Sequence, residues 1–420
     1  MVREKACQIE IGRTRGLTLK NTLHPWWVLT RYFSIMPDWC HPYHDRERPV
    51  LNVFRCIGIA LVMCFISLMM IFHLTKMVMA ILVMTSLHSI IPYMLWLSAI
   101  PLALFTQFWY VYYRREFLHF FRDWGHFEKE LMLGYDHRDM APTIKKTRAL
   151  IYTSRLVMLT GLLVGMGFVV FRKPDVPYLL SHLQFLRQIV PVPILCSIHL
   201  VNITCVVILA SFCDSVSALA FYHIALEVRV LLQEFERTFT ILDPPNNDGK
   251  MTDQLELNRG FLFATQLRQL FHYYETLRSF VNRSNSLFGV LWFLNHCMRL
   301  TIICIMLYSV LYMFQRSPED AGIYLANLLA NVYELVICIL LTTKIYCASD
   351  ELRSVLTVLL TKYWDLIPNR ERELLIVFIG RLQTDPLAAS PLSLYNVTPS
   401  FLLTITSLTI TYVVILLQSK

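Results

Sequence analysis

Four polar residues in the last apolar run of the chain recur at helical spacing. Thr404, Ser407, Thr411 and Gln418 are separated by three, four and seven residues, so they share one face of a helix. On a membrane helix such a face either bonds to neighbouring helices or lines a water-filled pathway, and the spacing alone leaves both interpretations open. The second interpretation requires symmetric copies around an axis, because one helix does not enclose a pore.

Two charged residues occupy equivalent positions in consecutive apolar runs. Arg299 lies near the middle of residues 286–313, and Glu334 lies near the middle of residues 322–346. A short loop joins the two runs, so the helices are antiparallel and the charges sit at similar depth. Because a lone charge inside a bilayer costs at least about 2.5–3.5 kcal/mol on insertion scales, we expect an ion pair. It is either purely structural or an element that couples two sites.

Aromatic and amide side chains on three apolar runs predict a small-molecule site in the outer half of the membrane. They would enclose an aromatic cavity with a few polar groups, which is the usual composition of such sites. The alternative is helix–helix contact together with a belt of interfacial tyrosines. The candidate residues are His199, Tyr308, Tyr312, Tyr324, Asn327 and Asn331.

The composition predicts the elements that position these residues. Of the 420 residues, 55% are apolar and only 16% are charged, against about 25% charged in average soluble proteins. Apolar runs of about 20 residues or more are the signature of membrane-spanning helices. We expect an all-α polytopic membrane protein with seven spans. They are residues 52–74, 78–112, 150–171, 189–212, 286–313, 322–346 and 394–417.

The distribution of Lys and Arg predicts the orientation. The second run is long and holds Pro92 and Pro101, so it could be one kinked span or two. Treating it as one span gathers most Lys and Arg residues on the same side as the N-terminus, which the positive-inside rule places in the cytoplasm. The C-terminus is then extracellular, an inverted arrangement relative to G-protein-coupled receptors.

The cytoplasmic segments are predicted to be helical. An amphipathic pattern over residues 215–242, a turn cluster at 243–250 and a second helical stretch at 252–284 predict a hairpin. Residues 349–383 predict two further helices, the first capped by Ser349 or Asp350 and the second separated from it at Pro368. The expected divisions are 1–50, 51–213, 214–285, 286–346, 347–393 and 394–420, of which 1–50, 214–285 and 347–393 are cytoplasmic.

Other chemistry is not indicated. Cys40, His41 and His44 lie close together, but a zinc site would also need a fourth ligand and second-shell support, so we do not expect one. Most cysteines lie in apolar runs, so no disulfide framework is predicted. Motifs of nucleotide-binding loops, zinc proteases and nucleophile elbows are missing, so we expect no enzyme, no catalytic residue, no metal and no cofactor. The formal charge of +8 reflects contact with membrane lipid on the cytoplasmic side and not nucleic-acid binding.

The ending "TYVVILLQ" at residues 411–418 resembles the C-terminal signature of the insect gustatory receptor family, which belongs with the odorant receptors to the insect seven-transmembrane chemoreceptor superfamily. The family pattern is Thr-Tyr, five apolar residues, Gln and then Phe. Length, inverted topology and long cytoplasmic helices extend the resemblance. Ser419 departs from the pattern where the family has Phe, and Val413 stands where the sugar-receptor branch has Glu.

The resemblance implies a chemosensory, ligand-gated, non-selective cation channel in the plasma membrane of a sensory neuron dendrite. Such channels are homo- or heterotetramers in which the seventh helix lines a central pore and the cytoplasmic helices form an anchor. A small-molecule tastant would open the pore. The implied pore residues are Thr404, Ser407, Thr411, Ile415, Gln418 and Ser419, with Ile415 replacing the missing Phe as a dewetting gate.

Three alternatives remain at this point. The chain could be an odorant-receptor-type channel subunit, a seven-span receptor that signals without conducting, or a transporter. Paired inverted repeats and broken midplane helices, which indicate transporters, are not evident in the sequence. Under the channel hypothesis, the pair of Arg299 and Glu334 becomes a candidate gating element.

Overall fold

The computed structural model describes residues 49–83, 87–134, 192–243, 253–314 and 318–418, together with Leu19 and a few isolated positions between residues 145 and 156. The regular elements in these ranges are all helices. In chain order they are α4 (Pro49–Leu82), α5 (Leu87–Tyr112), α6 (Arg114–Gly134), α10 (Val192–Thr240), α11 (Asp253–Phe314), α12 (Pro318–Lys362), α13 (Asn369–Thr384), the 3₁₀ turn η2 (Pro391–Ser393) and α14 (Phe401–Gln418).

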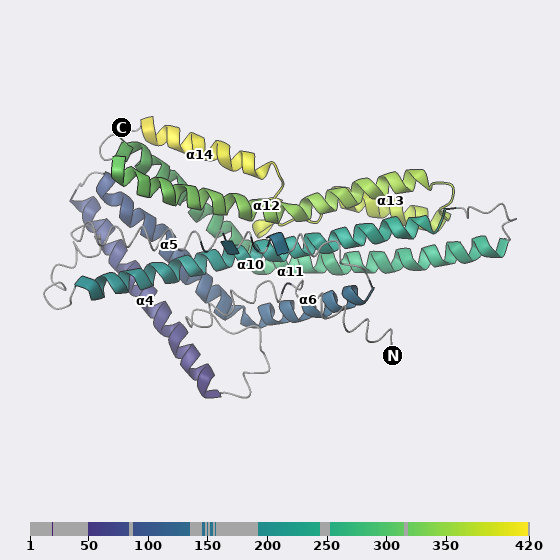
Figure 1. Ribbon diagram of the computed structural model, residues 1–420, viewed down its shortest axis with the longest axis horizontal. Helices are drawn as coiled ribbons and strands as arrows, with labels where there is room; N and C mark the ends of the chain where they lie inside the picture. The colour runs from purple at the N-terminus through teal and green to yellow at the C-terminus, as the bar shows by residue number, and fades with distance from the viewer. Residues whose placement is uncertain are drawn as a thin grey trace.

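Three very long helices form the centre of the protein. α10, α11 and α12 pack on one another and run side by side along the long axis in Figure 1. α11 has 62 residues, which at about 1.5 Å per residue corresponds to roughly 90 Å. A bilayer core requires only about 20 helical residues, so each of these helices continues far beyond one membrane.

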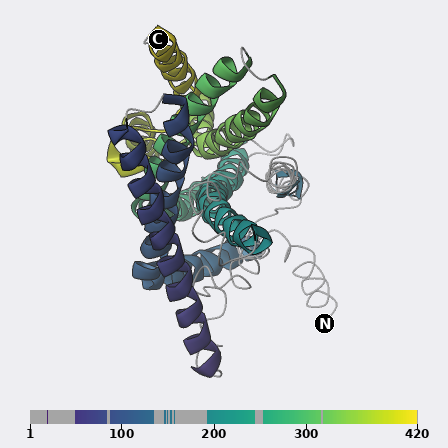
Figure 2. The same ribbon diagram turned by 90° about the vertical axis from the view of Figure 1, so that its left-hand side faces the viewer.

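The pair of α4 and α5 and the single helix α14 flank this centre. α4 packs mainly on α5, and α5 packs on α10 and α11. In Figure 2 α4 runs along one side of the molecule, while α14 lies at its outer edge at the top. The exposed face of α4 is apolar, with Leu61 at 64% and Leu68 at 61% exposed, as expected for a surface that contacts lipid acyl chains.

Aromatic side chains of α6 at helical spacing form part of the buried core. Phe117, Phe120 and Trp124 of α6 recur three and four residues apart and are buried. They pack on α11, where the ring of Phe120 lies 5.9 Å from that of Phe280, and the ring of Trp124 lies 5.0 Å from it. The amphipathic pattern of α6 therefore turns its aromatic face inward and leaves Arg115 and Arg122 exposed.

The apolar windows of the described helices agree with a membrane protein. Four helices of the described part of the chain are long and apolar enough to cross a membrane. They contain the windows Cys56–Met79, Asp214–Thr240, Asn258–Phe314 and Tyr324–Lys362, and a shorter apolar stretch covers Phe401–Ile415. The window in α10 is almost wholly buried by protein, so its apolar side chains contact other helices and not lipid.

The first two predicted spans differ from the observed helices at their junction. α4 continues through Lys76 to Leu82, whereas the first predicted span ends at residue 74 and the second begins at residue 78. Neither Gly nor Pro interrupts the chain between Gly58 and Pro92, so nothing ends the helix at residue 76. Pro92 and Pro101 both lie within α5, which spans the second run from Leu87 to Tyr112. The predicted third span, 150–171, falls almost entirely outside the described residues.

Two further boundaries were predicted wrongly. No new helix begins at Ser349, because α12 runs unbroken from Pro318 to Lys362. The Ser349 hydroxyl oxygen instead accepts a hydrogen bond from the backbone amide of Leu387 at 3.0 Å. The last helix begins at Phe401 and not at residue 394, since η2 and a loop containing Pro399 precede it and proline lacks the backbone donor that a helix interior requires.

The hairpin expected for residues 214–285 corresponds to the end of α10 and the start of α11. α10 ends at Thr240 and α11 begins at Asp253, so both helices extend past the predicted spans as continuous rods. Phe235 of α10, Phe271 of α11 and Phe378 of α13 hold this end together, with ring centroids 4.7–6.0 Å apart. The cytoplasmic location of this end stays a prediction.

Candidate functional site

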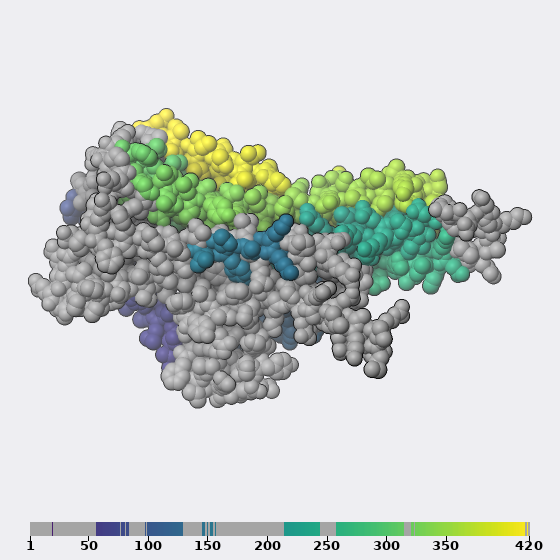
Figure 3. Space-filling view, viewed as in Figure 1, coloured from purple at the N-terminus to yellow at the C-terminus, as the bar shows by residue number. Residues whose placement is uncertain are grey.

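α14 packs on the protein through one face only. Ile405 and Val413 are 5% and 7% exposed, and Leu402 and Thr409 are half-buried on the same face. These residues are three and four apart, so they form a stripe that contacts α11. The space-filling view in Figure 3 has α14 lying along the upper edge of the molecule, with much of its surface uncovered.

The polar stripe predicted for the last helix lies on the opposite face. Thr404, Ser407, Thr411, Ile415 and Gln418 are all exposed. At about 100° per residue, the centre of this stripe lies about 180° around the helix from the stripe that packs on α11. The stripe is therefore turned away from its own subunit. Ser419 lies outside the described residues.

Two hydroxyl groups of the polar stripe already donate hydrogen bonds within α14. Thr404 and Thr411 donate to the carbonyl oxygens of Ser400 at 3.4 Å and Ser407 at 2.9 Å. Each hydroxyl oxygen retains lone pairs that can accept from water. α14 contains no charged residue, so an aqueous path along it would have a neutral lining of hydroxyl and amide oxygens. Such a lining can solvate small cations without a fixed charge.

A buried ion network joins α10, α11 and α12. Arg299 forms an ion pair through Nη1 with Glu334, as the sequence analysis expected. Its Nε donates to Oδ2 of Asp214 at 2.6 Å, and its Nη2 lies 2.6 Å from the same oxygen. The side chains of Arg299, Asp214 and Glu334 are 3%, 0% and 1% exposed, so one guanidinium bridges two carboxylates away from water. The role of this network in gating stays a prediction.

Asparagine side chains complete the network. Nδ2 of Asn295 donates to Oδ1 of Asp214, and Nη1 of Arg299 donates to Oδ1 of Asn331 at 3.5 Å. Asn331 in turn donates to the carbonyl oxygen of Asn327 at 2.9 Å, one turn earlier in α12. Asn295 thus donates to one carboxylate and Asn331 accepts from the guanidinium, and both bonds lower the free energy cost of burying these charges.

Sequence reasoning missed Asp214. It lies one residue beyond the section 51–213 that was predicted to hold the first four spans, at the end of the apolar stretch "CVVILASFC", and no partner was sought for it. An acidic residue that directly follows so apolar a stretch is a signal for a buried partner. Its actual partner, Arg299, is 85 residues away in the chain, so only the packing of α10 on α11 brings them together.

A chain of stacked side chains leads from the network to the start of α14. Asn295 of the network is followed by His296, whose ring stacks on Trp292 with centroids 3.6 Å apart. The Trp292 ring lies 5.9 Å from Phe401, the first residue of α14, and Phe401 stacks on Tyr395 at 4.9 Å. The buried charges and the exposed polar helix are therefore connected through contiguous packing.

The residues predicted to form a small-molecule site are described only in part, and the site stays a prediction. Tyr308 and Tyr312 stack with centroids 6.3 Å apart, and Tyr324 is half-buried against the core. Asn331 faces the ion network through its bond to Arg299. The side chain of His199 lies outside the described residues. Two cavities lie along α11, and none of these residues lines either of them.

Metal ligation has no support in the described ranges. Within them, no group of three or more His, Cys, Asp or Glu side chains could hold a metal ion. Cys40, His41 and His44 lie outside the described residues.

Comparisons with known proteins agree with the helical architecture. The family model described as 7tm Odorant receptor matches residues 86–383, which is more than half of the chain. The solved structure of the insect olfactory receptor OR5 from Machilis hrabei in complex with eugenol aligns with a TM-score of 0.70 at 13% identity, over 96% of this chain and 99% of that one. The same receptor without eugenol in its description aligns with a TM-score of 0.68 at 14% identity, over 95% and 98%. No curated relative matches the chain by sequence.

Proposed function

The chain belongs to the 7tm odorant receptor family, and from that premise we propose that it is a subunit of a ligand-gated, non-selective cation channel in a chemosensory plasma membrane. The C-terminal motif predicted the gustatory family, whereas the family match supports only the wider insect chemoreceptor superfamily. A small organic molecule is the proposed ligand, as eugenol is for the olfactory receptor of similar fold. No catalytic role is proposed.

One observation carries the proposal. The polar stripe of α14 is exposed on the face opposite its contact with α11, so none of the other described helices of its own subunit covers it. Hydroxyl and amide groups that face lipid form no hydrogen bonds with the acyl chains. Four such stripes around a symmetry axis would instead enclose a hydrated path. We therefore propose a homo- or heterotetramer, with Thr404, Ser407, Thr411 and Gln418 along the pore and Ile415 at its constriction.

A tastant is the second candidate ligand, favoured by one specific feature. The ending "TYVVILLQ" resembles the gustatory signature, and residues 411–418 lie outside the part matched by the odorant receptor family. The two candidates differ only in the chemistry of the ligand, because the channel and its pore helix are the same in both.

Recordings of ligand-evoked current test the proposal. The chain is expressed in a heterologous cell, alone and together with related receptor subunits, and exposed to a panel that contains eugenol and bitter tastants. The Gln418→Arg channel should be less permeable to cations than the wild type, because an arginine at the pore mouth would repel them. The matched Gln418→Glu channel should keep or increase its cation permeability, because a carboxylate there would attract them. Surface-expressed protein that gives no current with any partner, but activates a G-protein reporter, would favour the non-conducting receptor instead.

A further inference from the structure

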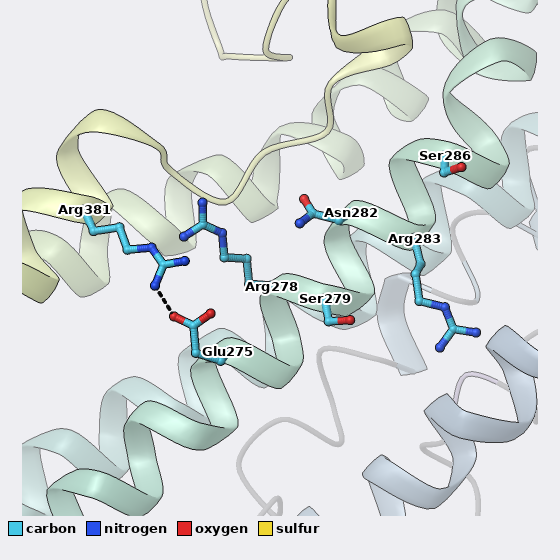
Figure 4. Close-up of a pocket in the computed structure, with 7 residues that line it drawn as sticks. All are labelled: Glu275, Arg278, Ser279, Asn282, Arg283, Ser286 and Arg381. Carbon is cyan, nitrogen blue, oxygen red and sulfur yellow. Dashed lines mark hydrogen bonds and ion pairs between the residues drawn. The ribbon is translucent and has the colours of Figure 1, made fainter.

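A cavity of about 530 Å³ opens beside α11 where its charged stretch ends (Figure 4). Arg278 and Glu275 of α11 and Arg381 of α13 lie at one end of it, and Arg381 forms an ion pair with Glu275. Arg283 lies at the other end, where it donates at 3.0 Å to Asp123 of α6, which does not line the cavity. Arg278 and Arg381 are the cationic groups at the end away from Arg283, and they form ion pairs with Asp385 and Glu275.

Neutral hydrogen-bonding groups line the wall between the arginines. Ser279, Asn282 and Ser286 lie three and four residues apart along α11, so they form one polar strip beside the cavity. This arrangement of guanidinium groups and hydroxyl or amide donors suits a ligand that combines phosphate with a polyol. Arginine binds phosphate oxygens through two parallel N–H donors, and the hydroxyl and amide groups of the strip can bond to the hydroxyl groups of a polyol.

A second cavity of about 590 Å³ continues from the first toward α14. It shares Arg278, Asn282 and Ser286 with the first and reaches the linker that enters the last helix. Leu392 lines it and is 43% exposed, and the neighbouring Leu394 is 66% exposed. Because these leucines are exposed where α11 turns from charged to apolar residues, we expect the two cavities to lie beside a bilayer surface.

The present partners of the two arginines are exchangeable. The side chains of Arg381 and Glu275 are 45% and 46% exposed, and Arg278, itself 17% exposed, pairs with Asp385, which is 62% exposed. Exposed pairs of this kind contribute only about 0–1 kcal/mol. Nη1 of Arg278 is buried and lacks a hydrogen-bond partner among the described residues, so an acceptor is missing at this point.

We propose that the two cavities bind a phosphomonoester, carried either by the headgroup of a phosphoinositide in the adjacent leaflet or by a free inositol phosphate. A phosphomonoester carries about −1.5 to −2 charges at neutral pH, so it competes effectively with the single charges of Glu275 and Asp385. It would bridge α13, α11 and the linker that holds Asp385. Control of the last helix through that linker rests on the proposed channel function, but binding itself does not.

Binding to the purified full-length receptor tests the site without any current measurement. Calorimetric titration with inositol hexakisphosphate should detect wild-type binding that weakens roughly tenfold or more in Arg381→Gln and in Arg278→Gln, as expected for the loss of a charged hydrogen-bond donor. Asn282→Leu, which changes no charge, should also weaken it. Glu275→Gln should strengthen it, because a competing carboxylate is removed.

Arg370→Gln is the matched control, since it removes the same charge from an exposed position at the start of α13, outside both cavities. It should leave the affinity within about twofold, the range expected of a distant exposed charge. An equal loss in Arg370→Gln and Arg381→Gln would mean diffuse attraction of anions and overturn the site.

A parallel arm distinguishes the two sources of the phosphate. The receptor in nanodiscs that contain phosphatidylinositol bisphosphate, or phosphatidylserine at equal total charge, is analysed for retained lipid by native mass spectrometry. Retention of the phosphoinositide that Arg381→Gln abolishes assigns the site to a lipid, whereas binding of the free inositol phosphate alone assigns it to a soluble ligand. Binding of neither probe, or equal retention of phosphatidylserine, would overturn the proposal.

Discussion

Two regions of this protein use the same pair of chemical groups, guanidinium and carboxylate, under opposite conditions. Arg299 with Asp214 and Glu334 is shielded from water between three helices, with side chains at most 3% exposed. Arg381 with Glu275, and Arg278 with Asp385, lie at the surface of the helical extension. In the buried region no water is present to solvate a charge that loses its partner, so breaking a pair there is costly. At the surface water can solvate the separated charges, so those pairs can exchange partners.

The largest effect is expected from Arg299→Leu. This change leaves Asp214 and Glu334 buried without their shared cation, and breaking a buried ion pair in this way costs about 3–5 kcal/mol. We expect loss of folded receptor at the cell surface, measured by fluorescence-detected size exclusion and surface labelling. Arg353→Leu is the control, because Arg353 pairs with Asp350 at an exposed position. Normal surface levels in Arg299→Leu would contradict the importance of the network.

Exchanging the charges of Arg299 and Glu334 sharpens the comparison. If only their pair mattered, Arg299→Glu with Glu334→Arg would restore it, but the structure places Asp214 against position 299 as well. We expect the exchange alone to fail, since two carboxylates would face each other, and the added change Asp214→Asn to recover part of the surface expression and thermal stability. Full recovery by the exchange without Asp214→Asn would mean that Asp214 is not a true partner.

The smallest effect on stability is expected from Arg381→Gln. Its partner Glu275 is 46% exposed, so the loss should be at most about 1 kcal/mol and should shrink further at high salt. Thermal unfolding of the solubilised receptor at low and high salt measures this difference. A loss as large as that of Arg299→Leu would remove the contrast between the two regions.

The sequence predicted what depends on local periodicity. The stripe of Thr404, Ser407 and Thr411 and the pair of Arg299 and Glu334 follow from helical spacing and from matched depth in consecutive helices. Both arrangements are present in the structure. The pore and gating roles given to these residues stay predictions.

Features set by packing between distant segments were not predictable in this way. Asp214 meets Arg299, and Arg381 meets Glu275 across 106 residues, only because α10, α11 and α13 lie side by side. The start of α14 depends on a linker whose Leu392 and Ser393 adopt φ values of 54° and 56°, a conformation that local propensity disfavours for such residues. That conformation fits the close packing of the linker on α11, where a Cβ added at Gly289 would lie 3.3 Å from the Leu392 amide nitrogen.

Cysteine accessibility along α14 tests the central claim most directly. Ser407→Cys, Thr411→Cys and the control Ile410→Cys place a thiol on three exposed positions of one helix, of which only the first two lie on the polar stripe. In surface-expressed receptor, a cationic thiosulfonate reagent should reduce ligand-evoked current through the two stripe variants and leave Ile410→Cys and the wild type unchanged. Equal modification at all three positions, or modification of Ile410→Cys alone, would contradict a water-filled conduit on the Thr and Gln face.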